Sequence, residues 1–452
     1  MGLLSTTVQL ILSLSILVVL HEMGHYLPAR WFKTRVEKFY LFFDFLFPLP
    51  NVLNFSLFKK KIGDTEWGLG WFPFGGYVKI AGMVDESMDT EQLAKPPEPW
   101  EFRAKPAWQR LIIIIGGVTV NLILGLVLYA MILFVWGRDY LPLESVTYGV
   151  TPSATMQAEG IAPGDRIVAV PGHEVRSLDE VGKAILIDGA RELVVEHNGE
   201  RRTITLSPDV QDSVMDKGEK TFFLPRVPFV IDSIMPKGTA LATKAFQKGD
   251  RIVGLNGEFT LYADGFIEAL AEQKDTWAVV TVWRNGDAQQ PHYIPVQVSE
   301  KGKIGLANRD LDKQFTLANE RYTFFQAIPA GIRYGLNTLG NYVNSLKLIF
   351  SSSGVKQMGG FGSIGGLFGE WGDWQTFWSV TALLSIILAF MNILPIPMLD
   401  GGHMIFILWE MITRRAPNQK VMEVAQMVGM VLLFSLIIFA NGNDLFKAIT
   451  GK

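Results

Sequence analysis

The segment V-L-H-E-M-G-H-Y-L, residues 19–27, contains His21, Glu22 and His25 in the order H-E-x-x-H. On an α-helix, residues four apart lie on the same face, so both imidazoles can bind one metal ion. Glu22 is the residue type that acts as general base on water in zinc hydrolases with this motif. Two core histidines with ordinary hydrogen bonds are the alternative interpretation. The spacing therefore predicts one half of a hydrolytic metal site.

A third ligand must come from another part of the chain, because a catalytic zinc ion usually has three protein ligands and one water. The chain has no cysteine, which leaves histidine and carboxylate side chains. Asp400 is the only acid at the end of an apolar stretch near the C-terminus, and Gly401 and Gly402 allow close backbone approach beside it. We predict Asp400 as the third ligand. His403 is a competing candidate, and helix capping by Asp400 is the structural alternative.

The elements that must position these residues are apolar enough to cross a membrane. Hydrophobic residues make up 49% of the 452 residues, and charged residues only 19%. Uncharged stretches of about eighteen residues or more predict membrane-spanning helices. The predicted spans are residues 3–20 within a helix over 1–27, 111–136, 377–399 within a helix over 377–410, and 424–440 within a helix over 421–440. A helix in a bundle core is the alternative for the last of them.

The distribution of Lys and Arg predicts how these spans are oriented. Basic residues are frequent in the segment 28–110 and between the last two spans, and they are sparse beside the long region 137–376. This pattern places 28–110 in the cytoplasm and 137–376 outside, together with both termini. The first and third spans then run in the same direction. The H-E-x-x-H motif and Asp400 are therefore expected at similar depth, near the cytoplasmic side.

The third span contains an internal interruption, M-N-I-L-P-I-P-M-L-D-G-G, at residues 391–402. Pro395 and Pro397 cannot continue an α-helix without losing hydrogen bonds. Irregular backbone at membrane depth is tolerated only where it is buried in protein or lines a wet cavity. We expect this stretch to be unwound. Asn392, which precedes the prolines, is then available to a substrate backbone or to an oxyanion.

The second span carries small and polar residues at four-residue spacing. Gly117, Asn121 and Gly125 lie on one helical face, which favours close packing against another helix. Asn121 is therefore a candidate for a structural or substrate-contacting role.

The region between the second and third spans contains an internal repeat. A-P-G-D-R-I-V at 162–168 and Q-K-G-D-R-I-V at 247–253 align, and each copy is followed by a helical stretch and an Asn-Gly hairpin signal. We predict two small α+β modules over 144–210 and 221–300. Apolar residues at helical spacing over 322–350 predict an amphipathic helix at the membrane surface, with a plain linker helix as the alternative.

In this order, the motifs H-E-M-G-H, G-G-V-T-V-N, G-D-R-I-V and N-I-L-P-I-P-M-L-D-G-G resemble those of bacterial site-2 proteases of the regulator-of-sigma-E type. The resemblance covers essentially the whole chain. It implies Zn²⁺ bound by His21, His25 and Asp400, with Glu22 as general base and Asn392 in contact with substrate. No other cofactor is implied.

The resemblance also implies a fold class, namely a polytopic α-helical membrane protein with four transmembrane helices and two inserted periplasmic PDZ domains. The PDZ domains would act as a size filter that admits substrates trimmed by an upstream periplasmic site-1 protease. The segment G-L-G-W-F-P-F-G-G-Y-V-K-I, residues 68–80, resembles the family's membrane-associated β-hairpin, whose edge can pair with an extended substrate. Gly75 and Gly76 thereby join Asn392 and Asn121 as substrate-binding candidates. Two features depart from the family pattern: Phe361 stands at a proline position, and the apolar loop 43–61 is longer than usual.

These observations predict an intramembrane zinc metalloendopeptidase of the bacterial inner membrane, active in regulated intramembrane proteolysis. Its expected partners are the lipid bilayer and single-span membrane proteins such as anti-sigma factors or remnant signal peptides. The net charge of −3 gives no reason to expect nucleic acid. A transporter is one alternative, because polar residues on broken helices also mark ion paths. A non-catalytic PDZ scaffold is another, and two histidines with one carboxylate also suit an Fe(II) oxygenase.

Overall fold

The structure is a computed structural model in which the chain divides into two units, described separately below. The membrane unit comprises Met1–Gly137 and Arg321–Thr450, and the inserted unit comprises Arg138–Glu320. Parts of the loops 43–61 and 85–106, for which no role is assigned, lie outside the described residues. The structure describes residues 2–46, 52–83, 96–186, 188–211, 213, 219, 221–235, 238–240, 244–349, 359–415 and 418–450.

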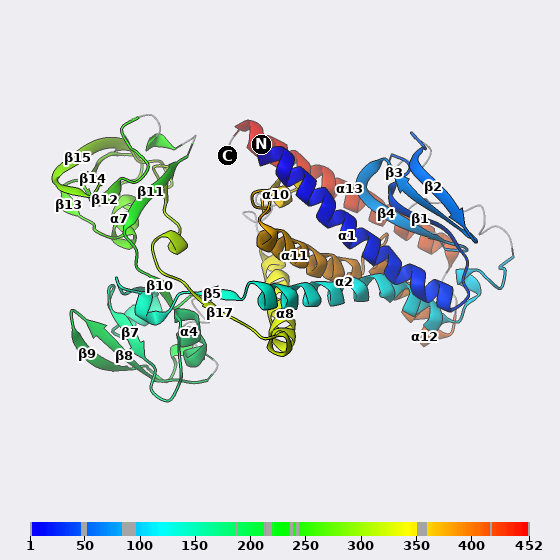
Figure 1. The fold of residues 1–452 in the computed structure, drawn as a ribbon, viewed down its shortest axis with the longest axis horizontal. Helices are drawn as coiled ribbons and strands as arrows, with labels where there is room; N and C mark the ends of the chain where they lie inside the picture. Colours follow the sequence, from blue (N-terminus) through cyan, green and yellow to red (C-terminus); the bar gives the residue numbers. More distant parts are fainter. Residues whose placement is uncertain are drawn as a thin grey trace. The chain divides into compact units, whose positions relative to one another are not determined.

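Among the described residues of the membrane unit, four helices are long and apolar enough to cross a membrane, as predicted (Figure 1). The four helices are α1 (Gly2–Trp31), α2 (Ala107–Val135), α11 (Trp374–Ile393) and α13 (Gln419–Thr450). Helices α1 and α13 extend beyond both ends of the uncharged stretches from which they were inferred, whereas α2 and α11 begin earlier than predicted and end before the predicted C-terminal residue. The first helix runs without a break through the whole H-E-x-x-H motif.

Helix α2 is packed closely against both α1 and α11 because glycines remove side chains at the contacts. A Cβ added at Gly24 of α1 would lie 2.5 Å from the carbonyl oxygen of Gly116 in α2. A Cβ at Gly125, on the predicted small-residue face of α2, would lie 2.7 Å from Cδ1 of Ile386 in α11. Such close approach of helix backbones at glycine is typical of helix packing in membranes. The glycines thereby fix the spacing of the helices that carry the candidate ligands.

The third span, predicted over 377–410 with an unwound stretch at its prolines, is interrupted in the structure. Helix α11 ends at Ile393, residues 394–399 are irregular, and α12 (Asp400–Thr413) starts at the predicted ligand. The prolines explain the break, since Pro395 and Pro397 cannot donate backbone hydrogen bonds to a helix. The predicted unwinding is confirmed. A Cβ at Gly401 would lie 2.1 Å from the carbonyl oxygen of Leu394, so this glycine lets the irregular stretch fold onto α12.

A four-stranded sheet packs against α1, and it corrects the predicted hairpin over 68–80. The strand order is β2-β3-β1-β4, with β1 parallel to β3 and antiparallel to β4. Strands β3 and β4 are consecutive in the sequence but do not pair, because only Trp71 separates them and β1 lies between them. The hairpin in this region is β2-β3 instead. The strands are β1 (Val36–Phe43), β2 (Ser56–Ile62), β3 (Thr65–Gly70) and β4 (Phe72–Ile80).

Helix α8 (Phe324–Ile349), within the segment predicted as an amphipathic helix, crosses α2. A Cβ at Gly331 would lie 2.4 Å from Cα of Ala130, and the rings of Tyr334 and Tyr129 are 4.8 Å apart. Its place at a membrane surface stays a prediction.

Phe361, the departure from the family's proline, begins the short helix α10 (Phe361–Gly365). Its backbone N–H donates to the Asn441 side chain of α13 at 3.1 Å. Asp444, one turn further along α13, accepts hydrogen bonds from the backbone of Gly360 and Ser363. The segment before α11 is therefore fastened to the last helix.

The inserted unit has two separate hydrophobic cores, one within residues 146–223 and one within 229–306. Phe222 and Phe223 belong to the first core, although the second module was predicted to begin at residue 221. A ribbon of β5 (Arg138–Tyr140) and β17 (Ala318–Glu320) joins the two ends of the unit. The first core is surrounded by β6 (Val150–Pro152), α3 (Ala154–Ala158), β7 (Arg166–Ala169), α4 (Leu178–Leu186), β8 (Glu192–His197), β9 (Glu200–Thr205) and β10 (Phe223–Pro225). The second core is surrounded by β11 (Phe229–Ile234), β12 (Arg251–Leu255), β13 (Glu258–Phe259), α7 (Ala263–Ala271), β14 (Trp277–Arg284), β15 (Asp287–Gln297) and β16 (Leu306–Asn308).

The repeated Gly-Asp-Arg-Ile-Val segment has the same structural role in both modules. Asp165 accepts a hydrogen bond from the backbone N–H of Ala162, and Asp250 accepts one from that of Gln247, each three residues earlier. An arginine from a later strand pairs with each carboxylate, Arg202 at 2.7 Å and Arg284 at 2.8 Å. The repeat therefore marks a turn held by a buried carboxylate, and it carries no catalytic chemistry.

We expect the stability of the first module to fall at acid pH because of the Asp165 carboxylate. Burial favours its neutral form, but the hydrogen bonds from Ala162, Arg202 and His197 outweigh burial and lower the pKa of Asp165. A carboxylate with a lowered pKa contributes stability above its unfolded-state pKa, and that stability is lost as pH falls through the lowered value. We expect Asp165→Asn to destabilise the module by about 1–3 kcal/mol near neutral pH, with a difference from the unaltered protein that shrinks below about pH 4.

The measurement is hydrogen exchange of β8 and β9 in the full chain, corrected for the intrinsic pH dependence of exchange. Asp188→Asn, at an exposed position of the same module, is the matched control. Equal protection in the Asp165 and Asp188 variants at neutral pH would contradict the assignment.

Candidate metal centre

Three predicted ligands from distant parts of the sequence meet in the membrane unit. Nε2 of His21 lies 3.2 Å from Nε2 of His25. Oδ2 of Asp400 is 3.3 Å from Nε2 of His21, and Oδ1 is 3.5 Å from Nε2 of His25. Ligand atoms about 2.0–2.1 Å from a tetrahedral zinc ion lie about 3.3–3.4 Å from one another. The two Asp400 distances are to different carboxylate oxygens. With one ligand atom taken from each residue, the three atoms lie within 4.8 Å of one another, close enough to surround a single metal ion.

The hydrogen bonds of His25 determine which of its nitrogens faces the site. Nδ1 lies 2.8 Å from the carbonyl oxygen of Ile113 in α2, and a carbonyl can only accept. Nδ1 therefore carries the proton, and neutral His25 presents the lone pair of Nε2 toward the other ligands. Such a partner on the second nitrogen is the usual arrangement for metal-binding histidines.

His21 is oriented in the same way by Asn121, which is 1% exposed. The Asn121 side-chain amide lies 3.2 Å from Nδ1 of His21, and in this orientation its buried Oδ1 has no hydrogen-bond partner among the described residues. Turning the amide brings its oxygen to Nδ1, which can then donate to it, and leaves Nε2 of His21 free to bind metal. The structure therefore places Asn121 as a support for His21.

The position of Asp400 fits a metal ligand better than a helix cap. Leu399 is the N-cap residue of α12, and Asp400 lies in the first turn. Its Oδ2 is buried and has no hydrogen-bond donor among the described residues. Two imidazole lone pairs and a carboxylate that face one another repel unless a cation lies between them. The donor set therefore fits a divalent metal ion.

The other sequence-predicted residues surround this cluster at different distances. The amide nitrogen of Asn392, at the end of α11, lies 3.4 Å from Nε2 of His21. Glu22 is 8% exposed and shares the ligand-bearing turn of α1. His403 is outside the cluster and contacts the side-chain amide of Gln426 in α13 at 3.2 Å.

Gly75 and Gly76 lie in β4, beside the apolar half of α1. A Cβ at Gly76 would be 2.8 Å from Cγ1 of Val18, which is one helical turn before His21. Gly75 has a φ of +147°, and a Cβ there would lie 2.5 Å from Cε2 of Phe43. The two glycines thus bring the β4 edge of the sheet close to α1, about one helical turn from His21.

Gly117 is a site residue that sequence reasoning assigned only to helix packing. A Cβ at this position would lie 2.4 Å from Nε2 of His25 and 2.6 Å from Cε1 of His21. The backbone of α2 therefore forms one wall of the metal site. Four-residue spacing with Asn121 was a signal that this face is close to another helix, but it did not show that the neighbour is the pair of ligands.

We expect Gly117→Ala to weaken zinc binding by about 10- to 100-fold, the range found when groups that orient metal ligands are disturbed. The added methyl group must push the imidazoles or the α1–α2 contact apart. Titration of the apoprotein with zinc measures the effect. Gly442→Ala is the control, since a Cβ at Gly442 meets no atom within 4 Å. Equal zinc affinity in the two variants would refute this account of the site.

The sequence of the chain is similar to those of proteins named zinc metalloproteases. The profile of peptidase family M50 matches residues 9–436. The chain belongs to peptidase family M50. A protein of Xylella fastidiosa is 28% identical over 96% of this chain and 97% of its own length. A protein of Treponema pallidum is 25% identical over 95% of this chain and 96% of its own length. A protein of Vibrio cholerae is 27% identical over 97% of this chain and 97% of its own length.

All three relatives are provisionally named zinc metalloproteases. The M50 chain is accordingly a zinc metalloendopeptidase of the site-2 type and, with four apolar helices, a multi-pass membrane protein. Zinc is its metal, in agreement with the fit of the three ligand atoms. When bound, zinc supplies a Lewis acid that makes water nucleophilic near neutral pH.

Proposed function

We propose that this M50 protease hydrolyses peptide bonds within the transmembrane segments of single-span membrane proteins. The observation that carries the proposal is the position of the ligands. His21 and His25 lie within an apolar helix long enough to span a membrane, and Asp400 follows the break after another. A protease with its ligands on such helices is suited to substrates that reach it through the bilayer. Anti-sigma factors and remnant signal peptides are the proposed substrates, in regulated intramembrane proteolysis in a bacterial inner membrane.

Proton transfer is the proposed task of Glu22. Its burial beside the ligands keeps the carboxylate out of bulk water, where it can take a proton from the attacking water and deliver it to the leaving amine. The Asn392 amide, close to His21, is suited to hold the substrate carbonyl or its developing negative charge.

A substrate helix must unwind before its peptide carbonyls can be attacked, and the free edge of β4 offers a partner for the unwound strand. β4 pairs only with β1, so its other edge keeps unpaired backbone groups among the described strands. Gly76 places this edge beside Val18, one turn from His21. β-Strand addition here would hold an extended substrate next to the metal.

The two modules of the inserted unit are proposed to be periplasmic PDZ domains that exclude substrates with large outer domains. Both have the small α+β cores expected of such modules. An upstream site-1 protease would then trim the substrate first, and the cytoplasmic side of the membrane is the proposed position of the metal centre.

The test is cleavage of a single-span substrate by the purified protein, with both reconstituted in one lipid nanodisc. We expect fragments cut inside the span, lost on zinc chelation and restored by zinc. A matched substrate with a bulky folded outer domain should be cut more slowly. Cleavage restricted to soluble loops would contradict the proposal, as would zinc-dependent ion movement without any cleavage.

A further inference from the structure

A cavity of about 360 Å³ lies where α1 ends and the sheet begins, away from the metal ligands. Three of its lining residues are basic and only one is acidic. The lining residues are Arg30, Lys33, Thr34, Arg35, Asp64 and Trp100. Asp64 lies 3.9 Å from Arg30, and both side chains are largely exposed, so this ion pair neutralises little of the positive charge. The cavity therefore favours an anion.

Two residues that line this cavity, Thr34 and Arg35, each carry a buried hydrogen-bond donor that has no partner among the described residues. Thr34 is 1% exposed, and its Oγ1 has no hydrogen bond within the described residues. Nε of Arg35 is likewise buried and unpaired. Buried donors without acceptors are costly, and an anionic oxygen would satisfy both of them. The donors and the positive charge thus point independently to the same class of ligand.

The cavity is held in shape by contacts that leave these donors free. The backbone N–H of Arg35 donates to the carbonyl oxygen of Trp100 at 3.0 Å, and the Arg35 guanidinium lies 5.3 Å from the centre of the Trp100 ring. The negative end of the α1 dipole opposes an anion at this position. Its last carbonyls are partly satisfied, since Thr34 and Lys33 donate to those of Ala29 and Arg30.

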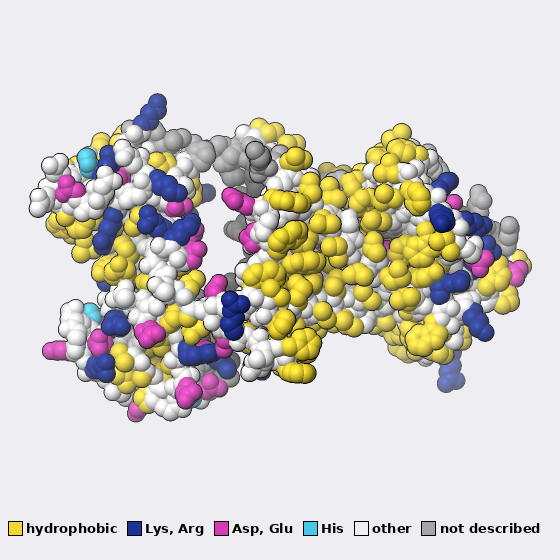
Figure 2. Space-filling view, viewed as in Figure 1, with side chains coloured by type: hydrophobic (Ala, Val, Ile, Leu, Met, Phe, Trp, Pro, Cys, Tyr) yellow, Lys and Arg dark blue, Asp and Glu magenta, His cyan; other side chains and the backbone are white. Residues whose placement is uncertain are grey.

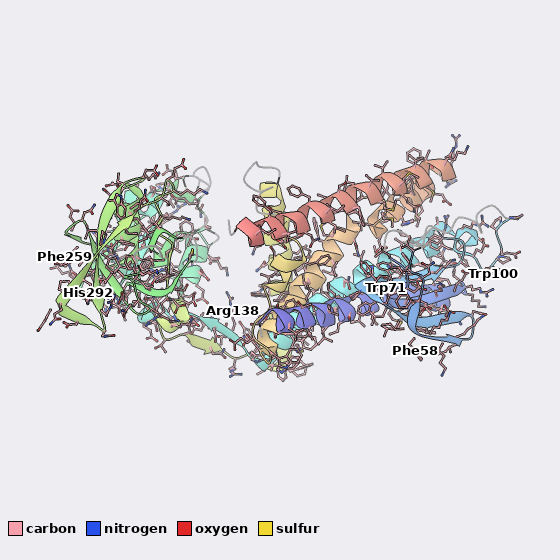
Figure 3. The ribbon with its side chains drawn as sticks, turned by 90° about the horizontal axis from the view of Figure 1, so that it is seen from above. Phe58, Trp71, Trp100, Arg138, Phe259 and His292 are labelled. Atoms are coloured by element: carbon pink, nitrogen blue, oxygen red, sulfur yellow. The ribbon has the colours of Figure 1, made fainter. Side chains whose placement is uncertain are left out.

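The surroundings of the cavity indicate a lipid headgroup as the source of the anion. α1 is an apolar helix that ends at this point, and Trp31 at its end is 81% exposed, as is typical of aromatic anchors at the membrane interface. Figure 2 shows Lys and Arg side chains gathered at this end of the membrane unit, beyond the hydrophobic surface of the helices. Trp100 lies at the same end, as labelled in Figure 3.

The neighbouring edge strand β2 adds positive charge and an exposed aromatic side chain near the cavity. Lys59, Lys60 and Lys61 of β2 are exposed. Phe58, next to them, is also exposed and lies at the outer edge of the sheet (Figure 3). Through the strand pairings, Phe58 lies level with Gly76, the residue that contacts the apolar half of α1. Lys61 is three residues after Phe58 on β2, in the direction of the cavity. The three lysines thus lie between the exposed Phe58 ring and the basic cavity, an arrangement that suits binding to an anionic lipid surface.

We propose that this cavity binds the phosphate of an anionic phospholipid in the leaflet beside the metal centre. The phosphate oxygens accept hydrogen bonds from Arg35 Nε and Thr34 Oγ1, and Arg30 and Lys33 supply the surrounding positive charge. The proposal rests on the membrane placement in the proposed function, but it does not need proteolysis. The lipid would hold the junction of α1 and the sheet at the membrane interface.

The test is native mass spectrometry of the full chain in detergent, titrated with phosphatidylglycerol or with phosphatidylcholine of the same acyl chains. We expect one phosphatidylglycerol to be retained at least tenfold more tightly than phosphatidylcholine. The variant with Arg30, Lys33 and Arg35 all changed to Gln should lose this preference. A variant with Lys274, Lys301 and Lys303 changed to Gln, three exposed lysines of the inserted unit, removes the same charge and should keep it.

Further arms separate the lipid from other anions and from misfolding. Arg35→Lys keeps the charge but removes the Nε donor, and it should bind phosphatidylglycerol more weakly than the unaltered chain. Unchanged zinc content in each variant checks that the membrane unit is intact. Equal retention of the two lipids, or a preference that survives in the Arg30, Lys33 and Arg35 variant, would overturn the proposal. Displacement of the lipid by inorganic phosphate at similar concentration would also overturn it, since the site would then select a free anion.

Discussion

Replacing Glu22 with glutamine is expected to abolish detectable cleavage of a membrane-embedded substrate while zinc content stays unchanged. Glutamine is almost the same size as glutamate, so the buried position beside the ligands is kept. It cannot accept a proton from water, and positioned general acid–base groups contribute roughly 10²–10⁴-fold to rate. The measurements are initial cleavage rates in nanodiscs and zinc per protein by elemental analysis.

Glu410→Gln is the matched control for this prediction. Glu410 is in the same membrane unit and pairs with Arg110 of α2, but it lies in α12 well beyond the ligand at its start. This variant should keep most of the activity. If Glu22→Gln still cleaved at a comparable rate, another residue would have to supply the base. If it lost zinc as well as activity, Glu22 would be needed for metal binding, and its catalytic role would not be supported.

The second large effect is expected for Asp400→Asn, which should lower zinc affinity by roughly a hundredfold or more, beyond the 10- to 100-fold typical of supporting groups. The carboxylate supplies the negative charge among three close ligand atoms, and a neutral amide does not replace it. Competition with a fluorescent zinc chelator measures the affinity. Cleavage should fall in parallel and recover partly at high zinc concentration.

Asp373→Asn provides the comparison, because this aspartate caps α11 by accepting a hydrogen bond from the backbone of Thr376. Loss of a helix cap costs about 1 kcal/mol of stability and should leave zinc affinity unchanged. An Asp400 variant that behaves like the Asp373 variant would restore the helix-capping interpretation. His403 would then be tested as the third ligand.

The clustering of the three candidate ligands could be predicted from the sequence because residue type and local spacing carry most of the information. His21 and His25 share a helical face in any helix, and Asp400 is the only acid at the C-terminal end of the apolar stretch 377–399. The break at Pro395 could be predicted for the same reason, since proline acts on the backbone beside it.

The roles that could not be predicted depend on which helices and strands become neighbours. The Ile113 carbonyl has no sequence signature as a partner for His25, because every residue has a carbonyl. The wall formed by Gly117 follows from the α1–α2 contact. The hairpin that the resemblance implied over 68–80 is wrong, because β1 lies between the two strands of this segment and pairs with both of them.

The β5–β17 ribbon brings the two ends of the inserted unit together at one point of the chain. Its two ends pair with each other, and Asn319 donates to Asp139 at 2.7 Å. In the membrane unit, Arg321 donates to the carbonyl oxygen of Val135 at 3.2 Å, so the chain leaves and re-enters at one place. A deletion of residues 138–320 thus needs only a short glycine linker, with a small loop-closure entropy. Such a deletion would leave His21, His25 and Asp400 in the chain, because all three belong to the membrane unit.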